Sequence, residues 1–131
     1  MEGGAKMTGE VLIYTGSFML FGWGAAHLFP TKNIVNGFGE ISPDNKRIIT
    51  MEWIIEGVSL VFIGFLVALV TYVESTSNIS NLVYWTSFGV LNVLSFISLF
   101  TGFKVSFFMY KLCPFIFSTS SLLIIIGSNI A

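Results

Sequence analysis

The chain has 131 residues, of which 54% are hydrophobic and only 10% are charged. An average soluble domain is about 25% charged, so a chain this short and this apolar cannot cover its hydrophobic surface with polar groups, and a lipid bilayer is its expected solvent. The net charge of −1 excludes the basic surface by which proteins bind nucleic acid. The single cysteine, Cys113, excludes an internal disulfide and a cysteine-based zinc site.

Four apolar runs follow one another along the chain, and each is close to the ~20 residues that span a hydrocarbon core. They lie near residues 11–29, 51–73, 82–103 and 107–130. The first ten residues lack the basic region of a signal peptide, so the first run is expected to be a retained helix. Short connections favour antiparallel neighbours. The predicted fold is therefore all-α: one transmembrane domain, residues 1–131, forming an antiparallel four-helix bundle.

The second helix is predicted to begin before its apolar run. In the stretch ISPDNKRIIT, Ser42 suits the N-cap and Pro43 suits the first helical position. The helix is therefore expected over residues 43–73, which is longer than a core of ~30 Å requires at ~1.5 Å per residue. Its first two turns are expected at the membrane interface. Just upstream, the stretch NGFG is predicted to form a turn, because Gly37 and Gly39 permit positive φ.

The positions of lysine and arginine predict the orientation of the bundle. One face has Lys6, and the other face has Lys32, Lys46, Arg47, Lys104 and Lys111. Because cytoplasmic loops carry the excess of these residues, we expect residues 30–50 and 104–106 in the cytoplasm and both termini on the same, non-cytoplasmic side. The chain is then an integral, multi-pass membrane protein, of the plasma membrane or of the inner membrane if it is bacterial.

A polar stripe runs along the otherwise apolar second helix. At about 100° per residue, the residues within one narrow arc are Asn45, Glu52, Glu56 and Ser59. Such a stripe should face protein or trapped water, because an ionised group in lipid costs several kcal/mol. Gly57 and Gly64 mark a second face of the helix, where another helix can approach closely.

The predicted topology gathers ionisable groups at the cytoplasmic pole. His27, the only histidine, is near the end of the first helix, at the level where Glu52 and Glu56 begin the second apolar run. Two carboxyl groups about 6 Å apart repel each other in a low dielectric, so one is expected to hold a proton or to pair with His27. We therefore predict a polar pocket whose candidate ligand-binding residues are His27, Glu52, Glu56, Asn92 and Asn45. Candidate catalytic residues are Glu56 and His27.

Plainer roles remain open for these residues. Glu52 is close enough to the interface to be simply solvated, and Asn92 suits a hydrogen bond between helices. The aromatic residues expected at the same pole suit membrane anchoring: Trp23, Trp53 and Tyr110. A native metal site is not expected, because the chain has one histidine and no Glu-x-x-His motif of the kind found in di-iron bundles.

Two stretches carry a family resemblance. FGWGAAHLF, at the end of the first helix, and EGVSLVFIGFLVAL, in the second, resemble the first two helices of DoxX-like membrane proteins. In this alignment Glu56, Gly57 and Gly64 take the family positions, and the match covers about half of the chain. The resemblance implies a small four-helix membrane protein. It also implies the functions known in that family, where some members are membrane subunits of quinone-linked sulfur oxidoreductases.

These observations favour a protein that binds a small amphipathic ligand, such as a quinone or a lipid-like molecule, alone or as a membrane subunit of a redox complex. One alternative is a membrane enzyme that acts on a lipid-like substrate, with Glu56 as general acid–base and His27 as its partner. Another is a proton-coupled transporter that relays protons through the glutamates, and a third is a structural or assembly subunit. The expected partners are the bilayer, the ligand, and a membrane protein or a second copy of the chain.

Overall fold

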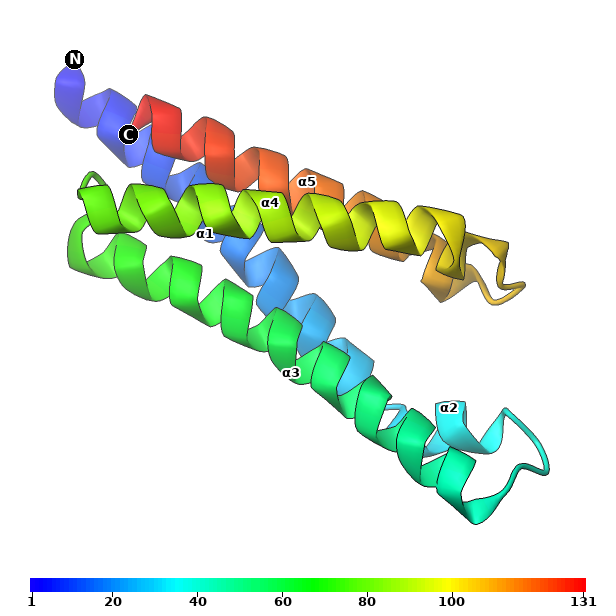
Figure 1. Cartoon of the computed structure of the whole chain (residues 1–131). Helices are drawn as coiled ribbons and strands as arrows, with labels where there is room; N and C mark the ends of the chain where they lie inside the picture. Colours follow the sequence, from blue (N-terminus) through cyan, green and yellow to red (C-terminus); the bar gives the residue numbers. More distant parts are fainter.

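The computed structural model describes residues 1–131, which form helices and no strands. The elements in chain order are α1 (Glu2–Leu28), α2 (Thr31–Asn36), α3 (Pro43–Glu74), α4 (Asn78–Phe100), the 3₁₀ turn η1 (Gly102–Lys104) and α5 (Phe108–Ile130). The four longest helices are long and apolar enough to cross a membrane. They run alternately in opposite directions, and both termini lie at the same end of the bundle (Figure 1). The predicted all-α four-helix membrane bundle is confirmed.

The helix starts follow the local capping chemistry. Pro43 opens α3, and the Ser42 side chain accepts a hydrogen bond of 3.2 Å from the backbone nitrogen of Asn45, as the sequence predicts. α4 starts about four residues earlier than its apolar run, because Ser77 caps it by accepting a 3.0 Å hydrogen bond from the Ser80 nitrogen. α1 also starts earlier, at Glu2, since hydropathy marks only the part of a helix that suits lipid.

The connection between α1 and α3 contains a short helix, α2, where the sequence pattern predicts only a loop. Gly39 has φ = 75° and so uses the conformational freedom of glycine before α3. Residues 37 and 38 do form a turn, in which Gly37 has φ = −64° and ends α2 without using the left-handed conformation. The backbone N–H of Gly37 donates to carbonyl groups of α2, so the residue continues the helical conformation instead of reversing it.

Glycine residues bring α1 and α3 into close contact. A Cβ atom on Gly24 would lie 2.8 Å from the Gly57 carbonyl oxygen, so a side chain at this position has no room. The Ser17 hydroxyl donates to the Gly64 carbonyl oxygen farther along the same contact. Small residues allow this approach, which supplies packing where lipid provides no hydrophobic drive between helices. The predicted close-approach face at Gly57 and Gly64 is therefore confirmed, and α1 is the helix that fills it.

The first half of α1 packs in the same way against α5. A Cβ atom on Gly16 would lie 2.8 Å from the Ser120 carbonyl oxygen, and one on Gly9 would lie 2.6 Å from that of Gly127. The contacts of Gly9 and Gly16 precede those of Ser17 and Gly24 along the helix. α1 therefore leaves α5 near its middle and continues along α3.

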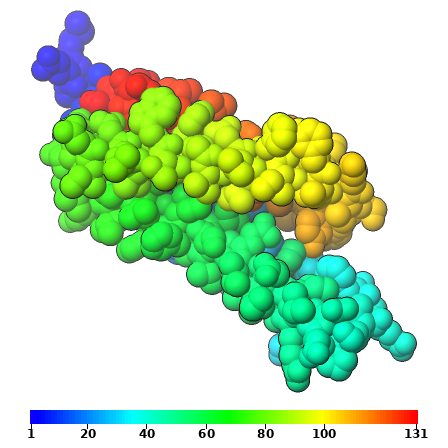
Figure 2. Space-filling model, viewed as in Figure 1, coloured from blue at the N-terminus to red at the C-terminus, as the bar shows by residue number.

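The bundle opens at the end opposite the termini. α3 and α4 are held together next to their connection, where the hydroxyl groups of Thr71 and Tyr84 lie 2.8 Å apart. α4 and α5 stay together through Ser95, whose hydroxyl lies 2.7 Å from that of Ser118. The result is two arms, α1 with α3 and α4 with α5, which diverge and leave a hollow between them (Figures 1 and 2).

Candidate functional site

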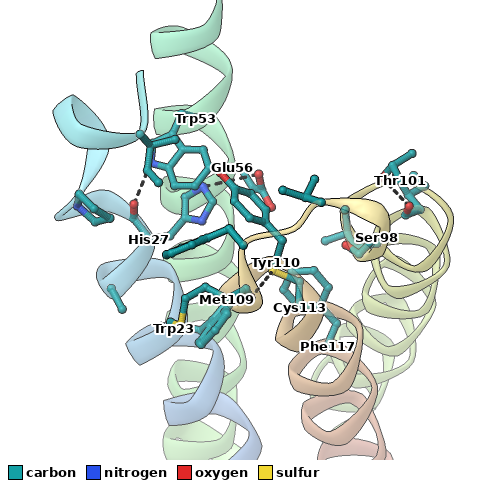
Figure 3. Close-up of a pocket in the computed structure, with 18 residues that line it drawn as sticks. Trp23, His27, Trp53, Glu56, Ser98, Thr101, Met109, Tyr110, Cys113 and Phe117 are labelled. Atoms are coloured by element: carbon teal, nitrogen blue, oxygen red, sulfur yellow. Dashed lines mark hydrogen bonds and ion pairs between the residues drawn. The ribbon is translucent and has the colours of Figure 1, made fainter. Parts of the chain in front are cut away.

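Between the diverging arms lies a cavity of about 740 Å³, which we call the cleft. Twelve of its 18 lining residues are hydrophobic. The residues labelled in Figure 3 come from α1, α3, α4 and α5, with Thr101 just after the end of α4, and are Trp23, His27, Trp53, Glu56, Ser98, Thr101, Met109, Tyr110, Cys113 and Phe117. All four long helices contribute, so the cleft exists only in the assembled bundle.

His27, Trp53 and Glu56 form one linked group on the α1–α3 side. The His27 and Trp53 rings are stacked, with centroids 3.7 Å apart. The Trp53 indole nitrogen donates a 2.8 Å hydrogen bond to the carbonyl oxygen of His27, which lies in the last turn of α1 where carbonyl groups lack helical partners. His27 Nε2 lies 3.5 Å from Glu56 Oε2. The side chain of His27 is 7% exposed and that of Glu56 is 46% exposed, so the carboxylate extends from this group into the cleft.

Aromatic rings continue from this group across the cleft. Tyr110 of α5 meets Trp53 edge to face, with centroids 5.9 Å apart, and Phe107 meets Tyr110 in the same way at 6.0 Å. Figure 3 shows the Glu56 carboxylate beside the rings of Trp53 and Tyr110. Pro114, one turn further along α5, has no N–H to donate to the Tyr110 carbonyl. The backbone that presents Tyr110 is therefore released from one helical hydrogen bond.

A second cavity of about 410 Å³, the side cavity, adjoins the cleft between α3 and α4. The two share Trp53, Glu56 and Leu94, so they meet at these residues. Glu52 lines the side cavity and not the cleft. Glu52, Glu56 and Ser59 all face this space, which matches three of the four residues predicted in the polar stripe.

The remaining predicted residues lie elsewhere. Asn45 is exposed in the first turn of α3 and lines neither cavity. Asn92 also lines neither cavity: its amide donates to the Phe88 carbonyl oxygen at 2.7 Å and to the Ser121 hydroxyl at 3.3 Å, which joins α4 to α5. The structure therefore brings His27 and Glu56 together, places Glu52 next to them, and leaves the two asparagines outside the cleft.

The aromatic residues of the cleft were interpreted from the sequence only as membrane anchors. Their spacing held a further signal, because residues three or four apart share one face of a helix. Trp23 precedes His27 by four positions, Trp53 precedes Glu56 by three, and Tyr110 precedes Cys113 by three. Each pair does line the cleft. Pairs of this kind on helices that meet at the same pole predict an aromatic pocket around the polar residues.

Two polar atoms of the cleft residues are buried without a hydrogen-bond partner, namely Trp23 Nε1 and His27 Nε2. The 3.5 Å separation of His27 from Glu56 is an ion-pair distance without hydrogen-bond geometry. Most buried polar groups in proteins do have a partner, so these atoms offer unused bonding capacity. No group of three or more His, Cys, Asp or Glu side chains is placed to hold a metal ion.

The fold and the cleft define a multi-pass membrane protein with a largely apolar pocket at one pole of a four-helix bundle. Comparison of the chain with protein-family models, with curated proteins and with solved structures finds no match. The resemblance of the first two long helices to DoxX-like proteins stays a prediction.

Proposed function

We propose that this protein binds a small amphipathic ligand in the cleft between its two arms. The observation that carries the proposal is the combination of a largely apolar cavity of about 740 Å³ with the His27–Glu56 pair in its wall. Ligand pockets in proteins usually enclose roughly 300–1,000 Å³, are mainly apolar, and contain a few polar groups that orient the ligand. The cleft has all three properties.

The unpaired atoms of the cleft support a ligand with a polar end. Trp23 Nε1 and His27 Nε2 lack partners in the protein, and Glu56 accepts no hydrogen bond from another residue. Leaving such groups unpaired in an apolar site costs free energy. A ligand that carries a polar head would pair with the exposed carboxylate of Glu56, while its apolar part would occupy the hydrophobic remainder of the cleft.

The position of the side cavity supports access from the bilayer. It lies between α3 and α4 and meets the cleft at Trp53, Glu56 and Leu94. Its other lining residues include Ile48 and Ile55, whose side chains are exposed on the lipid-facing surface. A molecule with an apolar tail would place its head in the cleft and let the tail pass between the two helices into lipid.

The test is to purify the full-length protein in a nonionic detergent and to identify bound molecules by mass spectrometry. Ser98→Trp adds a large side chain to the wall of the cleft and should abolish retention of the ligand. Phe96→Trp is the matched control, because Phe96 is on the same helix but is 66% exposed and faces lipid. It should retain the ligand as the unchanged protein does.

An amphipathic molecule that is enriched with the unchanged protein and with Phe96→Trp, but lost from Ser98→Trp, would support the proposal. Retention of the same molecule by Ser98→Trp would place its binding outside the cleft. A protein that co-purifies without any small molecule would favour an assembly role instead. Either result contradicts ligand binding in the cleft.

A further inference from the structure

Apart from His27, the ionisable groups with a charge at neutral pH that line the cleft and the side cavity are acidic. Glu56 lines both the cleft and the side cavity, and Glu52 lines the side cavity. Neither space is lined by a lysine, an arginine or an aspartate. Five basic residues belong to the same pole, but none of them lines either cavity: Lys32, Lys46, Arg47, Lys104 and Lys111.

Two of these basic residues are already engaged elsewhere. Arg47 pairs with Asp44 at 3.3 Å on the exposed surface of the first turn of α3. The Lys111 ammonium lies 5.8 Å from the centre of the Phe103 ring. The carboxylate of Glu56 is therefore left with a single nearby basic group, the His27 imidazole, which does not form a hydrogen bond with it.

Aromatic rings lie beside the Glu56 carboxylate. Trp53 and Tyr110 lie beside Glu56, Phe107 packs on Tyr110, and Trp23 also lines the cleft. The faces of such rings attract organic cations, most strongly where water is excluded, and aromatic cages are a recurrent way of binding ammonium groups. A carboxylate next to aromatic rings is a combination that suits an ammonium head.

From this arrangement we propose that the ligand's head is an organic cation, an alkylammonium group attached to an apolar tail. The inference rests on the proposed function, since it names the chemical class of ligand for the same cleft. A carboxyl group in an apolar space avoids an uncompensated charge either by taking up a proton or by pairing with a cation. An ammonium head supplies that cation and lies against the rings. An anionic head finds no lysine or arginine and meets a carboxylate that repels it.

Three probes with the same ten-carbon tail separate the effect of head charge from that of apolar burial. They are decyltrimethylammonium, decanol and decanoate, each titrated into the full-length protein in nonionic micelles. Trp23 and Trp53 line the cleft, so tryptophan fluorescence reports binding. Trp85 is 55% exposed in the first half of α4, away from the cleft, and Trp85→Phe removes its background signal.

We expect decyltrimethylammonium to bind roughly tenfold tighter than decanol, and decanoate to bind weakest. Glu56→Gln should remove the preference for the cation, so that decyltrimethylammonium binds no more tightly than decanol. Glu56→Lys should reverse the order, so that decanoate binds best. The matched control is Glu74→Gln, because Glu74 is 52% exposed at the opposite pole and should not affect any probe.

The inference of a cationic head is wrong if all three probes bind equally and Glu56→Gln does not change their binding. If Ser98→Trp still abolishes binding in that case, the proposed binding of an amphipathic ligand in the cleft stands. Tighter binding of decanol or decanoate by the unchanged protein also overturns the inference. If none of the probes gives a saturable response in the unchanged protein, both the cationic head and the amphiphile-binding cleft are contradicted.

Discussion

Trp53 connects three parts of the cleft wall. Its ring stacks on His27, its indole N–H donates to the carbonyl oxygen of His27, and its edge meets Tyr110 of α5. It therefore ties the end of α1 to α3 and orients the histidine that lies 3.5 Å from Glu56. Through these contacts a residue that resembles a membrane anchor becomes part of the cleft wall.

Trp53→Phe should lower stability by about 1 kcal/mol, because it removes one hydrogen bond to a carbonyl oxygen at a helix end while retaining an aromatic ring for stacking. Thermal unfolding of the purified protein in a nonionic detergent measures the change. Trp85→Phe is the control, since Trp85 is 55% exposed to lipid, and its unfolding temperature should not change. Equal behaviour of the two variants would show that the hydrogen bond to His27 contributes nothing to stability.

At the scale of the helices, α1 is the element that shapes the cleft. It packs on α5 through Gly9 and Gly16 and on α3 through Ser17 and Gly24. α1 stays beside α3, from the hydrogen bond between Glu10 and Ser75 to the contact of Gly24 with Gly57, but its contacts with α5 end in its middle. The second half of α1 therefore separates from the first half of α5, and the cleft lies in the space between them. The position of the small residues along one helix thus determines where the bundle opens.

Gly24→Ala should destabilise the bundle by roughly 1–3 kcal/mol, because the added Cβ would lie 2.8 Å from both the Gly57 carbonyl oxygen and the Val61 nitrogen. Both are backbone atoms, so the helices must move apart. Gly22→Ala is the matched control on the same helix, since a Cβ there meets nothing within 4 Å. It should be neutral or slightly stabilising, as alanine favours helix. The comparison uses thermal unfolding, and similar losses in both variants would contradict the packing described here.

For the whole molecule, the open end of the bundle carries the basic residues. The predicted orientation places this end, and with it the cleft, on the cytoplasmic side, while both termini face the other way. The structure places the termini together at the opposite end, next to the α3–α4 connection (Figure 1). Which end faces the cytoplasm rests on the five-to-one distribution of lysine and arginine.

Cysteine labelling in intact membranes tests this orientation. In a Cys113→Ala background, cysteines introduced by Thr76→Cys and Asn36→Cys should react with a membrane-impermeant reagent from opposite sides, with Asn36→Cys labelled from the cytoplasm. Both positions are exposed in connections outside the long helices. Labelling of Thr76→Cys from the cytoplasm would reverse the orientation of the cleft.

The sequence by itself determined the class of protein, because segments of about 20 apolar residues are stable only as helices in lipid. It also determined the start of α3, since the Ser42 cap and Pro43 act within a single turn. It indicated that His27 and Glu56 lie at one pole, which follows from the order and direction of the helices. These features depend on local chemistry or on chain length, and both can be read from the order of the residues.

Only the tertiary structure decided that the cleft exists and which residues line it. A cavity forms where helices separate, and that separation depends on the summed contacts of Gly9, Gly16 and Gly24 with two different helices. The same contacts bring Tyr110 to Trp53 across 57 positions of the chain and leave Asn92 in a contact between α4 and α5. Helical periodicity shows which face a residue occupies on its own helix, but the neighbour of that face is set by packing of the whole bundle.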